Sequence, residues 1–255
     1  YEIIDPVCGM LANGDTGDGK LPSEETLVSY VVRELAHEKD LHGKKVLVTA
    51  GPTQEAIDPV RYITNHSTGK MGYALAEAAM LRGAEVTLIS GPTAIEPPMF
   101  VNVIPIISAQ EMFEKVATNA TENDIIIKAA AVADYRPKEV CDEKIKKSDH
   151  DTEIELERTT DILAYLGKNK GKTFLCGFSM ETENMLENSR RKLDKKNLDM
   201  IVANNLKDKG AGFGVDTNLI TIITRDRELQ LELMSKQDAA NCILDEIIRK
   251  TGNRE

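Results

Sequence analysis

Short apolar runs alternate with longer amphipathic stretches along most of this chain. Several runs are apolar almost throughout, as in Glu85–Ser90 and residues 124–127, without the polar alternation of a half-exposed strand. Such runs are typical of strands that are covered on both faces of a sheet. The pattern predicts strands near residues 45–50, 85–90, 101–106, 124–129, 173–178, 198–203, 218–224 and 228–233. The stretches between them predict helices near 69–82, 108–120, 160–167, 181–195 and 235–250.

Strands and helices that alternate in this way predict an α/β fold. We expect a doubly wound, Rossmann-like and mostly parallel sheet, with its ligands bound beyond the carboxyl ends of the strands. The last two apolar runs are separated only by residues 225–227, which predicts an antiparallel hairpin at the C-terminal end of the sheet.

The first forty residues differ from the rest. Residues 1–22 are rich in turn signals and predict a loop or arm without a core of its own. Ser23 is followed by two acidic residues, so a helix is expected from there to about His37. We therefore expect two parts, an arm with a linker helix at 1–40 and the main domain at 41–255. Because the chain begins with Tyr1 and not with Met, we expect it to be a fragment of a longer protein.

The composition narrows the class of protein. The chain has 255 residues, of which 41% are hydrophobic and 29% are charged, as in an ordinary globular protein. Its net charge of −10 argues against a general nucleic-acid or membrane binder. No apolar run approaches the roughly 20 residues of a membrane span, and no secretory signal opens the chain. The four cysteines form no Cys-x-x-Cys pair, so we expect a cytoplasmic protein with neither a disulfide framework nor a metal site of its own.

The most informative segment is the polar loop DPVRYITNHSTGKMG at residues 58–72, between an apolar run and a predicted helix. Its side chains include those of Arg61, Asn65, His66 and Lys70. A helix N-terminus after such a loop can hold an anion, because free N–H groups and the helix dipole favour negative charge. The loop matches neither the Walker A pattern nor the glycine fingerprint of dinucleotide sites. It predicts a carboxylate or phosphate site, and the alternative is a long surface turn whose polar groups satisfy one another.

A second segment, AAAVADYRP at residues 129–137, follows the buried run at 125–127. Small residues at a strand end allow a ligand to approach the backbone closely. For the alanines alone, tight packing of a helix against the sheet is the simpler explanation. Asp134 can accept a hydrogen bond from a sugar hydroxyl or a base amine, or can lie near a magnesium ion.

Two basic clusters also qualify as binding groups. Residues 138–151 are highly charged and include Lys144, which predicts a mobile surface loop. A mobile lysine loop suits a polyphosphate, whereas a solvated charged face is the alternative. In residues 190–197, Lys192 and Lys196 are spaced to share one face of a helix. Cations that stabilise a helix C-terminus are the alternative there.

Together these segments resemble phosphopantothenate–cysteine ligase. The matching motifs are GPTxExxDPVRYIxNHSxGKMG, AAVADYRP, EKIKK, the Gly-Phe-x-x-Glu-Thr stretch at 177–182 and KKNLDxIxAN, in this order from about Lys45 onward. In bacteria this enzyme is the C-terminal half of a bifunctional coenzyme A biosynthesis protein. Residues 12–20 resemble the tail of the other half, a flavin-dependent decarboxylase, but Asn13 stands where that family has a catalytic cysteine and Lys20 replaces an arginine. The resemblance implies FMN only in a decarboxylase domain that this chain lacks.

The resemblance implies that CTP drives the coupling of 4′-phosphopantothenate to L-cysteine through an acyl cytidylate, with Mg²⁺ bound with CTP. It also implies a homodimer. The matched catalytic positions are Asn65 and Lys144. The matched CTP-binding positions are Asp134, Lys144, Asp161, Ile162, Phe178, Lys192 and Lys196, although Thr160 stands where the family usually has proline before Asp-Ile. The matched phosphopantothenate-binding positions are Arg61, Asn65, Ala130 and Ala131. A nicotinamide oxidoreductase and a nucleotide-binding regulatory module are the competing functions.

Overall fold

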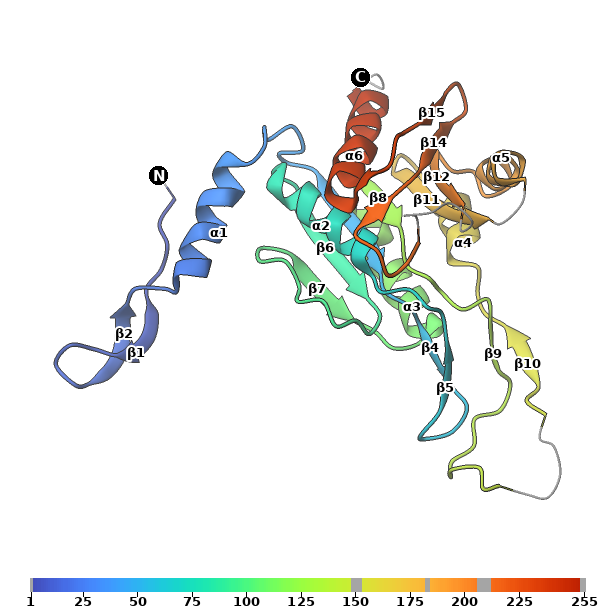
Figure 1. Cartoon of the computed structure of the whole chain (residues 1–255), viewed down its shortest axis with the longest axis horizontal. Helices are drawn as coiled ribbons and strands as arrows, with labels where there is room; N and C mark the ends of the chain where they lie inside the picture. Colours follow the sequence, from blue (N-terminus) through green and yellow to red (C-terminus); the bar gives the residue numbers. More distant parts are fainter. Residues whose placement is uncertain (1, 148–152, 182–183, 206–211, 253–255) are drawn as a thin grey trace.

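The apolar runs form the centre of one eight-stranded sheet in the computed structural model, which describes residues 2–147, 153–181, 184–205 and 212–252 (Figure 1). The strands are β3 Lys45–Ala50, β6 Glu85–Ser90, β7 Asn102–Pro105, β8 Ile125–Lys128, β11 Phe174–Glu181, β12 Met200–Asn205, β14 Thr221–Thr224 and β15 Glu228–Gln230. Their spatial order is β15-β14-β12-β11-β8-β3-β6-β7. Six neighbouring strands pair in parallel, namely β12, β11, β8, β3, β6 and β7. Strand β14 pairs antiparallel with β12, and β15 pairs antiparallel with β14. The predicted doubly wound sheet and its C-terminal hairpin are confirmed.

Helices cover both faces of the sheet because successive side chains of each central strand point to opposite sides. In β3, Val46 and Val48 belong to one core cluster and Leu47 to the other. The first cluster includes residues of α2 Lys70–Leu81 and α6 Lys236–Gly252. The second includes residues of α3 Ala109–Asn119, α4 Ile162–Asn169 and α5 Met185–Lys195. The short 3₁₀ helix η1, Ala120–Glu122, extends α3. None of the described helices is long and apolar enough to cross a membrane.

The strand order reverses between β3 and β8. After β3 the chain builds outward through β6 and β7, and it then returns to β8 on the other side of β3. The loops that follow these two strands therefore leave in opposite directions. In open α/β sheets a crevice for ligands forms at this point.

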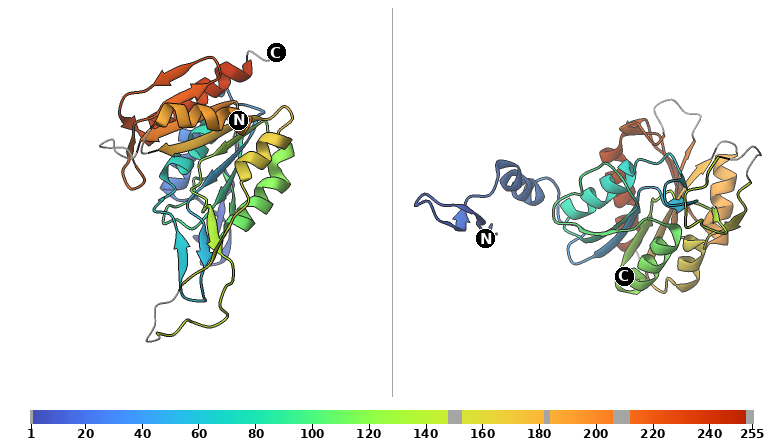
Figure 2. Two further views of the ribbon diagram at one scale, coloured as in Figure 1. Left: turned by 90° about the vertical axis from the view of Figure 1, so that its right-hand side faces the viewer. Right: turned by 90° about the horizontal axis from the view of Figure 1, so that it is seen from below.

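Two short hairpins project from the carboxyl edge of the sheet (Figures 1 and 2). One pairs β4 Gln54–Ala56 with β5 Tyr62–Thr64, and the other pairs β9 Tyr135–Pro137 with β10 Leu156–Arg158. The sequence pattern predicts a loop over residues 58–72, which is wrong for β5, and it predicts no strand at β4, β9 and β10. Each of these strands has only three residues and is partly exposed, so it carries too little periodicity to predict a strand.

The N-terminal arm lies beside the body of the molecule (Figures 1 and 2). It contains β1 Val7–Met10 paired with β2 Thr16–Lys20, followed by α1 Glu24–Leu35. The expectation of a loop for residues 1–22 is wrong for these two strands, whereas the helix lies where it is predicted. The α1 helix buries none of its residues and contacts the body through Tyr30, whose ring meets that of Phe100 edge to face at 4.7 Å.

The other elements differ from the prediction mainly at their ends. The predicted strand at 218–224 is divided into β13 Thr217–Asn218, which pairs with β16 Met234–Ser235, and β14. Strand β11 continues to Glu181, so α5 begins at Met185 and not near 181. Residues 182–183 of the predicted helix lie outside the described residues.

Candidate active site

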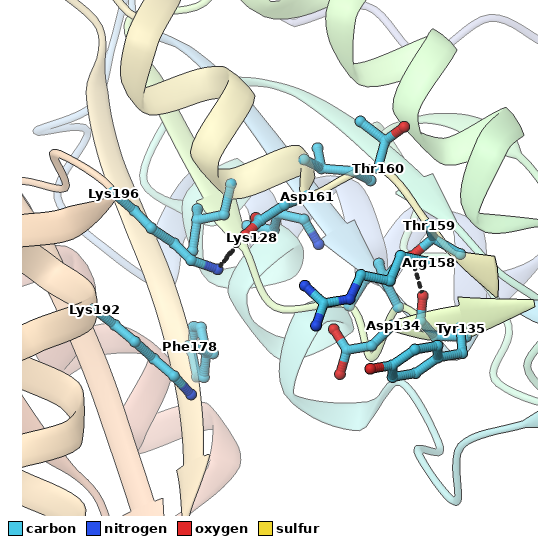
Figure 3. A pocket seen from close by; sticks show the side chains of 15 residues that line it. Lys128, Asp134, Tyr135, Arg158, Thr159, Thr160, Asp161, Phe178, Lys192 and Lys196 are labelled. Carbon is cyan, nitrogen blue, oxygen red and sulfur yellow. Dashed lines mark hydrogen bonds and ion pairs between the residues drawn. The ribbon is translucent and has the colours of Figure 1, made fainter.

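A cavity of about 450 Å³ opens beyond the carboxyl ends of β8 and β11 (Figure 3). It lies on the side of the sheet that α4 and α5 cover. Its lining residues come from β8 and the segment after it, from β10, from the start of α4, from β11 and from α5: Lys128, Ala130, Val132, Ala133, Asp134, Tyr135, Arg158, Thr159, Thr160, Asp161, Ile162, Leu163, Phe178, Lys192 and Lys196. Of the seven residues predicted to bind CTP, six line this one cavity, and Lys144 does not.

Asp161 begins α4 and faces the cavity at the same time. Its carboxylate accepts a hydrogen bond from the backbone N–H of Ala164 at 3.0 Å, as a helix N-cap does. It also pairs with the ammonium of Lys196 at 2.9 Å. Burial opposes ionisation of Asp161, but the Ala164 N–H and Lys196 outweigh it and hold the pKa of this carboxyl below its usual value.

Lys196 is held in place by a close approach of two backbones. A Cβ on Gly167 of α4 would lie 1.8 Å from the main-chain oxygen of Lys196, so only glycine fits there. The side-chain amide of Asn197 donates to the Gly167 oxygen at 2.8 Å. The end of α5 is thereby fixed against α4, which sets the distance of Lys196 from Asp161.

Lys192, one helical turn earlier, pairs with Glu181 at the end of β11. Its ammonium lies 2.5 Å from the Glu181 carboxylate and 3.3 Å from the hydroxyl of Ser179. Burial raises the pKa of Glu181, and the hydrogen bonds from Lys192 and Ser179 outweigh it, so the net shift is downward. Glu181 is part of a sequence motif but is not predicted from it as a partner of Lys192.

Lys128 and Arg158 also line the cavity, and the sequence analysis did not predict them as site residues. Lys128 is half-buried, and burial together with the nearby charge of Lys196 lowers its pKa to about 8. The sequence contains a signal for it, since a lone lysine ends a run of three isoleucines, at the carboxyl end of a buried strand.

A second cavity, of about 160 Å³, lies at the N-terminus of α2 and shares Ala130 and Phe178 with the first. Its lining residues are Ser67, Thr68, Gly69, Lys70, Met71, Gly72, Ala129, Ala130, Ala131, Phe178, Met180, Asn204, Gly212, Phe213, Asn218 and Lys236. No side chain caps this helix, whose N-cap residue Gly69 has a φ of 82°. A Cβ on Gly72 would lie 2.5 Å from that of Ala50, so the glycine lets the helix start close to β3. Uncapped N–H groups at a helix start favour an anion.

The predicted catalytic Asn65 lies beside this second cavity. Its side-chain amide donates to the main-chain oxygen of Ala131 at 3.0 Å. The same oxygen accepts a hydrogen bond from the N–H of Thr53 at 3.2 Å, and the Ala131 N–H donates to the main-chain oxygen of Gly51 at 2.9 Å. These bonds hold Asn65, the loop after β3 and the segment after β8 together at the point where the strand order reverses. Ala130 and Ala131 both line the second cavity.

Arg61 and Lys144 lie outside both cavities. Arg61 pairs with the buried carboxylate of Asp58 and donates to the Ile145 oxygen at 3.0 Å. The hydrogen bonds from the Arg61 guanidinium hold the pKa of Asp58 well below its usual range. Because Asp58 also accepts from the Ile145 N–H at 3.1 Å, this pair fixes the middle of the charged loop to the β4–β5 hairpin.

Lys144 is exposed on the anchored part of that loop. The structure therefore does not bring Lys144 to the cavity that the other predicted nucleotide residues share. Residues 148–151 of the predicted mobile loop lie outside the described residues. Within the described ranges, no group of three or more His, Cys, Asp and Glu side chains has the arrangement to hold a metal ion.

Comparisons with known proteins identify the family of this chain. The sequence model of the DNA/pantothenate metabolism flavoprotein C-terminal domain matches residues 41–250. The chain belongs to this family. The resemblance drawn from the motifs is thereby confirmed at the level of the family.

Three relatives extend the comparison. The coenzyme A biosynthesis bifunctional protein CoaBC of Bacillus subtilis (strain 168) is 49% identical over 261 residues, which cover 100% of this chain and 64% of that protein. A cysteine/cysteine sulfinic acid decarboxylase of an unknown prokaryotic organism is 47% identical, over 96% of this chain and 70% of that protein. The crystal structure of the C-terminal domain of CoaBC superposes with a TM-score of 0.74 and 45% identity, over 85% of this chain and 100% of that one. The chain thus spans less than two thirds of the B. subtilis relative.

Proposed function

We propose that this chain is a phosphopantothenate–cysteine ligase that uses CTP to join 4′-phosphopantothenate to L-cysteine. The observation that carries the proposal is the pair of cavities that share Ala130 and Phe178. One is lined by four cationic side chains and suits a nucleoside triphosphate. The other lies at an uncapped helix start and suits a second anion. The likeness to the C-terminal domain of CoaBC, a coenzyme A biosynthesis protein, supports this assignment.

The chemistry follows from the weakness of a free carboxylate as an electrophile. A carboxylate oxygen of phosphopantothenate attacks the α-phosphorus of CTP, and the bond to pyrophosphate breaks. The amine of cysteine then attacks the acyl carbon, the bond to CMP breaks and the amine loses a proton. The enzyme mainly has to bring two anions together and stabilise the charge of the leaving groups.

Each of the matched site residues has its own role in binding or chemistry. Lys192 and Lys196 bind phosphates. Phe178 packs against the nucleotide, and Asp134 accepts hydrogen bonds from it. Asp161 and Ile162 shape the nucleotide site at the start of α4. The Asn65 amide has a second N–H besides the one bonded to Ala131, and that N–H is proposed to donate to the reacting acyl oxygen. Ala130 and Ala131 expose backbone to phosphopantothenate. Arg61 binds phosphopantothenate and Lys144 the triphosphate when the hairpins that carry them close over the cavities.

Magnesium is proposed to enter with CTP, since Mg²⁺ is usually held by one or two carboxylates together with phosphate oxygens. Asp134, whose carboxylate is drawn at the cavity in Figure 3, is the residue that would hold it. Bound there, the ion would neutralise charge on the departing pyrophosphate. FMN is proposed only for a decarboxylase domain outside this sequence, fused to the ligase in the full-length protein.

A homodimer is proposed on the basis of the two projecting hairpins. These hairpins carry large apolar side chains that are about half exposed, namely Val60 at 59%, Tyr62 at 51%, Tyr135 at 47% and Leu156 at 46%. Apolar groups gathered on protruding strands favour a protein partner, and a second copy of the chain is the simplest one. We also propose a division into residues 1–40, an arm with a linker helix, and 41–255, the ligase domain, in a cytoplasmic protein.

The deciding experiment measures pyrophosphate release with CTP, ATP, GTP and UTP, with and without phosphopantothenate and cysteine. We expect release with CTP and phosphopantothenate alone, because the carboxylate must be activated before the amine attacks. Addition of cysteine should then release CMP and form the amide. Release that strictly required cysteine would contradict the two-step scheme. The absence of release with all four nucleotides would contradict the proposed function, as would an NADH-dependent reaction in its place.

A further inference from the structure

Lys128 is the last residue of β8 and lies at the centre of the carboxyl edge of the sheet. In register it stands between Thr49 of β3 and Gly177 of β11. Ile126, two residues earlier in the strand, belongs to the core cluster beneath α3, α4 and α5. Residues two apart in a strand share a face, so Lys128 faces α4 and α5 and lines the larger cavity there.

The other two lysines of the cavity have partners, and Lys128 has none. Lys196 pairs with Asp161, and Lys192 pairs with Glu181. The Lys128 ammonium makes no hydrogen bond or ion pair within the described residues, although three lysines and Arg158 converge on this cavity (Figure 3). A half-buried ammonium without a partner is costly, and this cost is recovered when an anion binds to it.

The charged groups that face Lys128 come from each element around it. Asp134 follows β8, Asp161 is the N-cap of α4 and Lys196 is the C-cap of α5. Burial lowers the pKa of Lys128 most, and Lys196 lowers it further, while the attraction of the two carboxylates is too weak to compensate. Asp161 is already engaged with Lys196. The charge that would restore an ordinary pKa therefore has to come from a ligand.

We propose that Lys128 is a nucleotide-binding residue of this site, and that its ammonium contacts the phosphate chain of the nucleotide. The proposal rests on the proposed function and adds a residue to it. Phosphates suit the position of Lys128 better than the base does. Four cationic side chains and two aspartates line the cavity, and the neutral heteroatoms of a base cannot balance this excess of positive charge. A lysine ammonium is a compact point charge with three donors, which suits phosphate oxygens. Lys128 also lies two residues before Ala130, which lines both cavities, so the phosphate it binds is close to the second substrate.

This contact makes nucleotide binding take up a proton. At pH 8 the free Lys128 is about half protonated, and a bound phosphate favours the charged form. Isothermal titration of the 255-residue chain with Mg²⁺ and CTP, in two buffers of different ionisation enthalpy, measures this uptake directly. We expect about half a proton per CTP at pH 8 and almost none at pH 6.5. Cytidine, which has no phosphates, should bind without uptake.

Lys128→Met removes the charge and keeps much of the length of the side chain. We expect it to abolish the proton uptake and to weaken CTP binding at pH 7 by about tenfold or more, without changing the affinity for phosphopantothenate. The matched control is Lys195→Met, since Lys195 is exposed on α5 and lines neither cavity. It should bind CTP as the parent does.

The outcomes separate the two proposals. If the parent chain bound no nucleotide, the proposed function would be wrong. If the parent bound CTP without proton uptake at pH 8 and Lys128→Met bound it equally well, the function would stand and the role of Lys128 would be overturned. If cytidine binding took up the same proton as CTP, Lys128 would contact the base and not the phosphates, which also overturns the proposal. The proton measurement on the parent does not depend on whether the variant folds.

Discussion

The side-chain amide of Asn65 donates a 3.0 Å hydrogen bond to the main-chain oxygen of Ala131. This bond joins the loop that precedes α2 to the segment that follows β8, at the place where the strand order reverses. It fixes the amide beside the smaller cavity, which Ala131 lines, without using all of its hydrogen-bonding groups. Asn65 is therefore oriented before any ligand binds, which is what electrostatic stabilisation of a transition state requires.

The first prediction is that Asn65→Ala lowers ligase turnover by about a hundredfold, the usual effect of removing one donor to a developing negative charge. The melting temperature should change little, because Asn65 is only half-buried. The control is Thr64→Val, which removes the neighbouring 2.7 Å bond from Thr64 to the Thr53 oxygen and leaves the amide in place. If both variants lost the same activity, Asn65 would act only by holding its loop.

The second prediction concerns Gly167. A Cβ at this position would lie 1.8 Å from the Lys196 oxygen, so Gly167→Ala must separate α4 from the end of α5. We expect a lower melting temperature, and a KM for CTP that rises several-fold because Lys196 moves away from the cavity. The KM for phosphopantothenate should be unchanged. Gly252→Ala is the control, since nothing lies within 4 Å of a Cβ there.

The sheet could be predicted from the sequence because its strands are buried on both faces. The isoleucines of β8 and the apolar run of β3 are almost fully buried, and their hydrophobicity alone predicts a position inside the protein. The hairpins β4–β5 and β9–β10 could not be predicted, because strands of three partly exposed residues have a pairing partner only once the rest of the fold exists.

The same contrast applies to the candidate site. Asp134 and Lys196 were found because they lie in motifs that resemble a family, and the fold brings them to one cavity. Lys128 was missed because it lies outside those motifs, although a charge at the end of a buried strand is a physical signal by itself. Nor does the sequence indicate that Arg61 turns toward Asp58 and Ile145 and away from both cavities, because that depends on how two hairpins pack together.

The third prediction separates the two roles of Asp161. Asp161→Ala removes both the N-cap of α4 and the partner of Lys196, and should destabilise the fold by about 1 kcal/mol, as loss of a cap usually does. Asp161→Asn keeps a capping oxygen and loses only the ion pair, so its unfolding free energy at pH 7 should fall less.

The pH dependence provides a separate test. The folded pKa of Asp161 lies below its ordinary value of 3.8. A lowered pKa adds stability that is present above 3.8 and is lost as the pH falls through the folded pKa. Stability of the parent should therefore drop more steeply below about pH 4 than that of Asp161→Asn, as measured by urea unfolding. Identical slopes would mean that folding does not lower the pKa of Asp161.

The fourth prediction concerns the N-terminal arm. Asn13 cannot supply a thiol, so the chain should release no carbon dioxide from phosphopantothenoylcysteine. It should also bind no flavin, because FMN is proposed only for a decarboxylase domain outside this sequence. Flavin absorbance and trapped carbon dioxide measure these directly, and detection of either would mean that residues 1–22 were misinterpreted. Removal of residues 1–22 should leave ligase turnover largely intact, because none of these residues lines either cavity.

The last prediction distinguishes a catalytic loop from a solvated charged face. Lys144 is exposed and lies outside both cavities, on a loop whose neighbouring residue Ile145 is fixed by Asp58 and Arg61. If Lys144 meets the triphosphate only when its hairpin closes, its charge acts mainly on the chemical step. Lys144→Gln should then lower turnover by at least about tenfold, or roughly 1.4 kcal/mol of transition-state stabilisation.

The melting temperature should barely move, because an exposed loop lysine contributes little to stability. Lys147→Gln is the matched control, because Lys147 is also exposed on the same loop, and its effect should be smaller. The test is sharpest in single-turnover measurements of pyrophosphate release, where product release does not mask the chemical step. Unchanged turnover in both variants would mean that the loop is a solvated face, and that the cations of the larger cavity bind the triphosphate without Lys144.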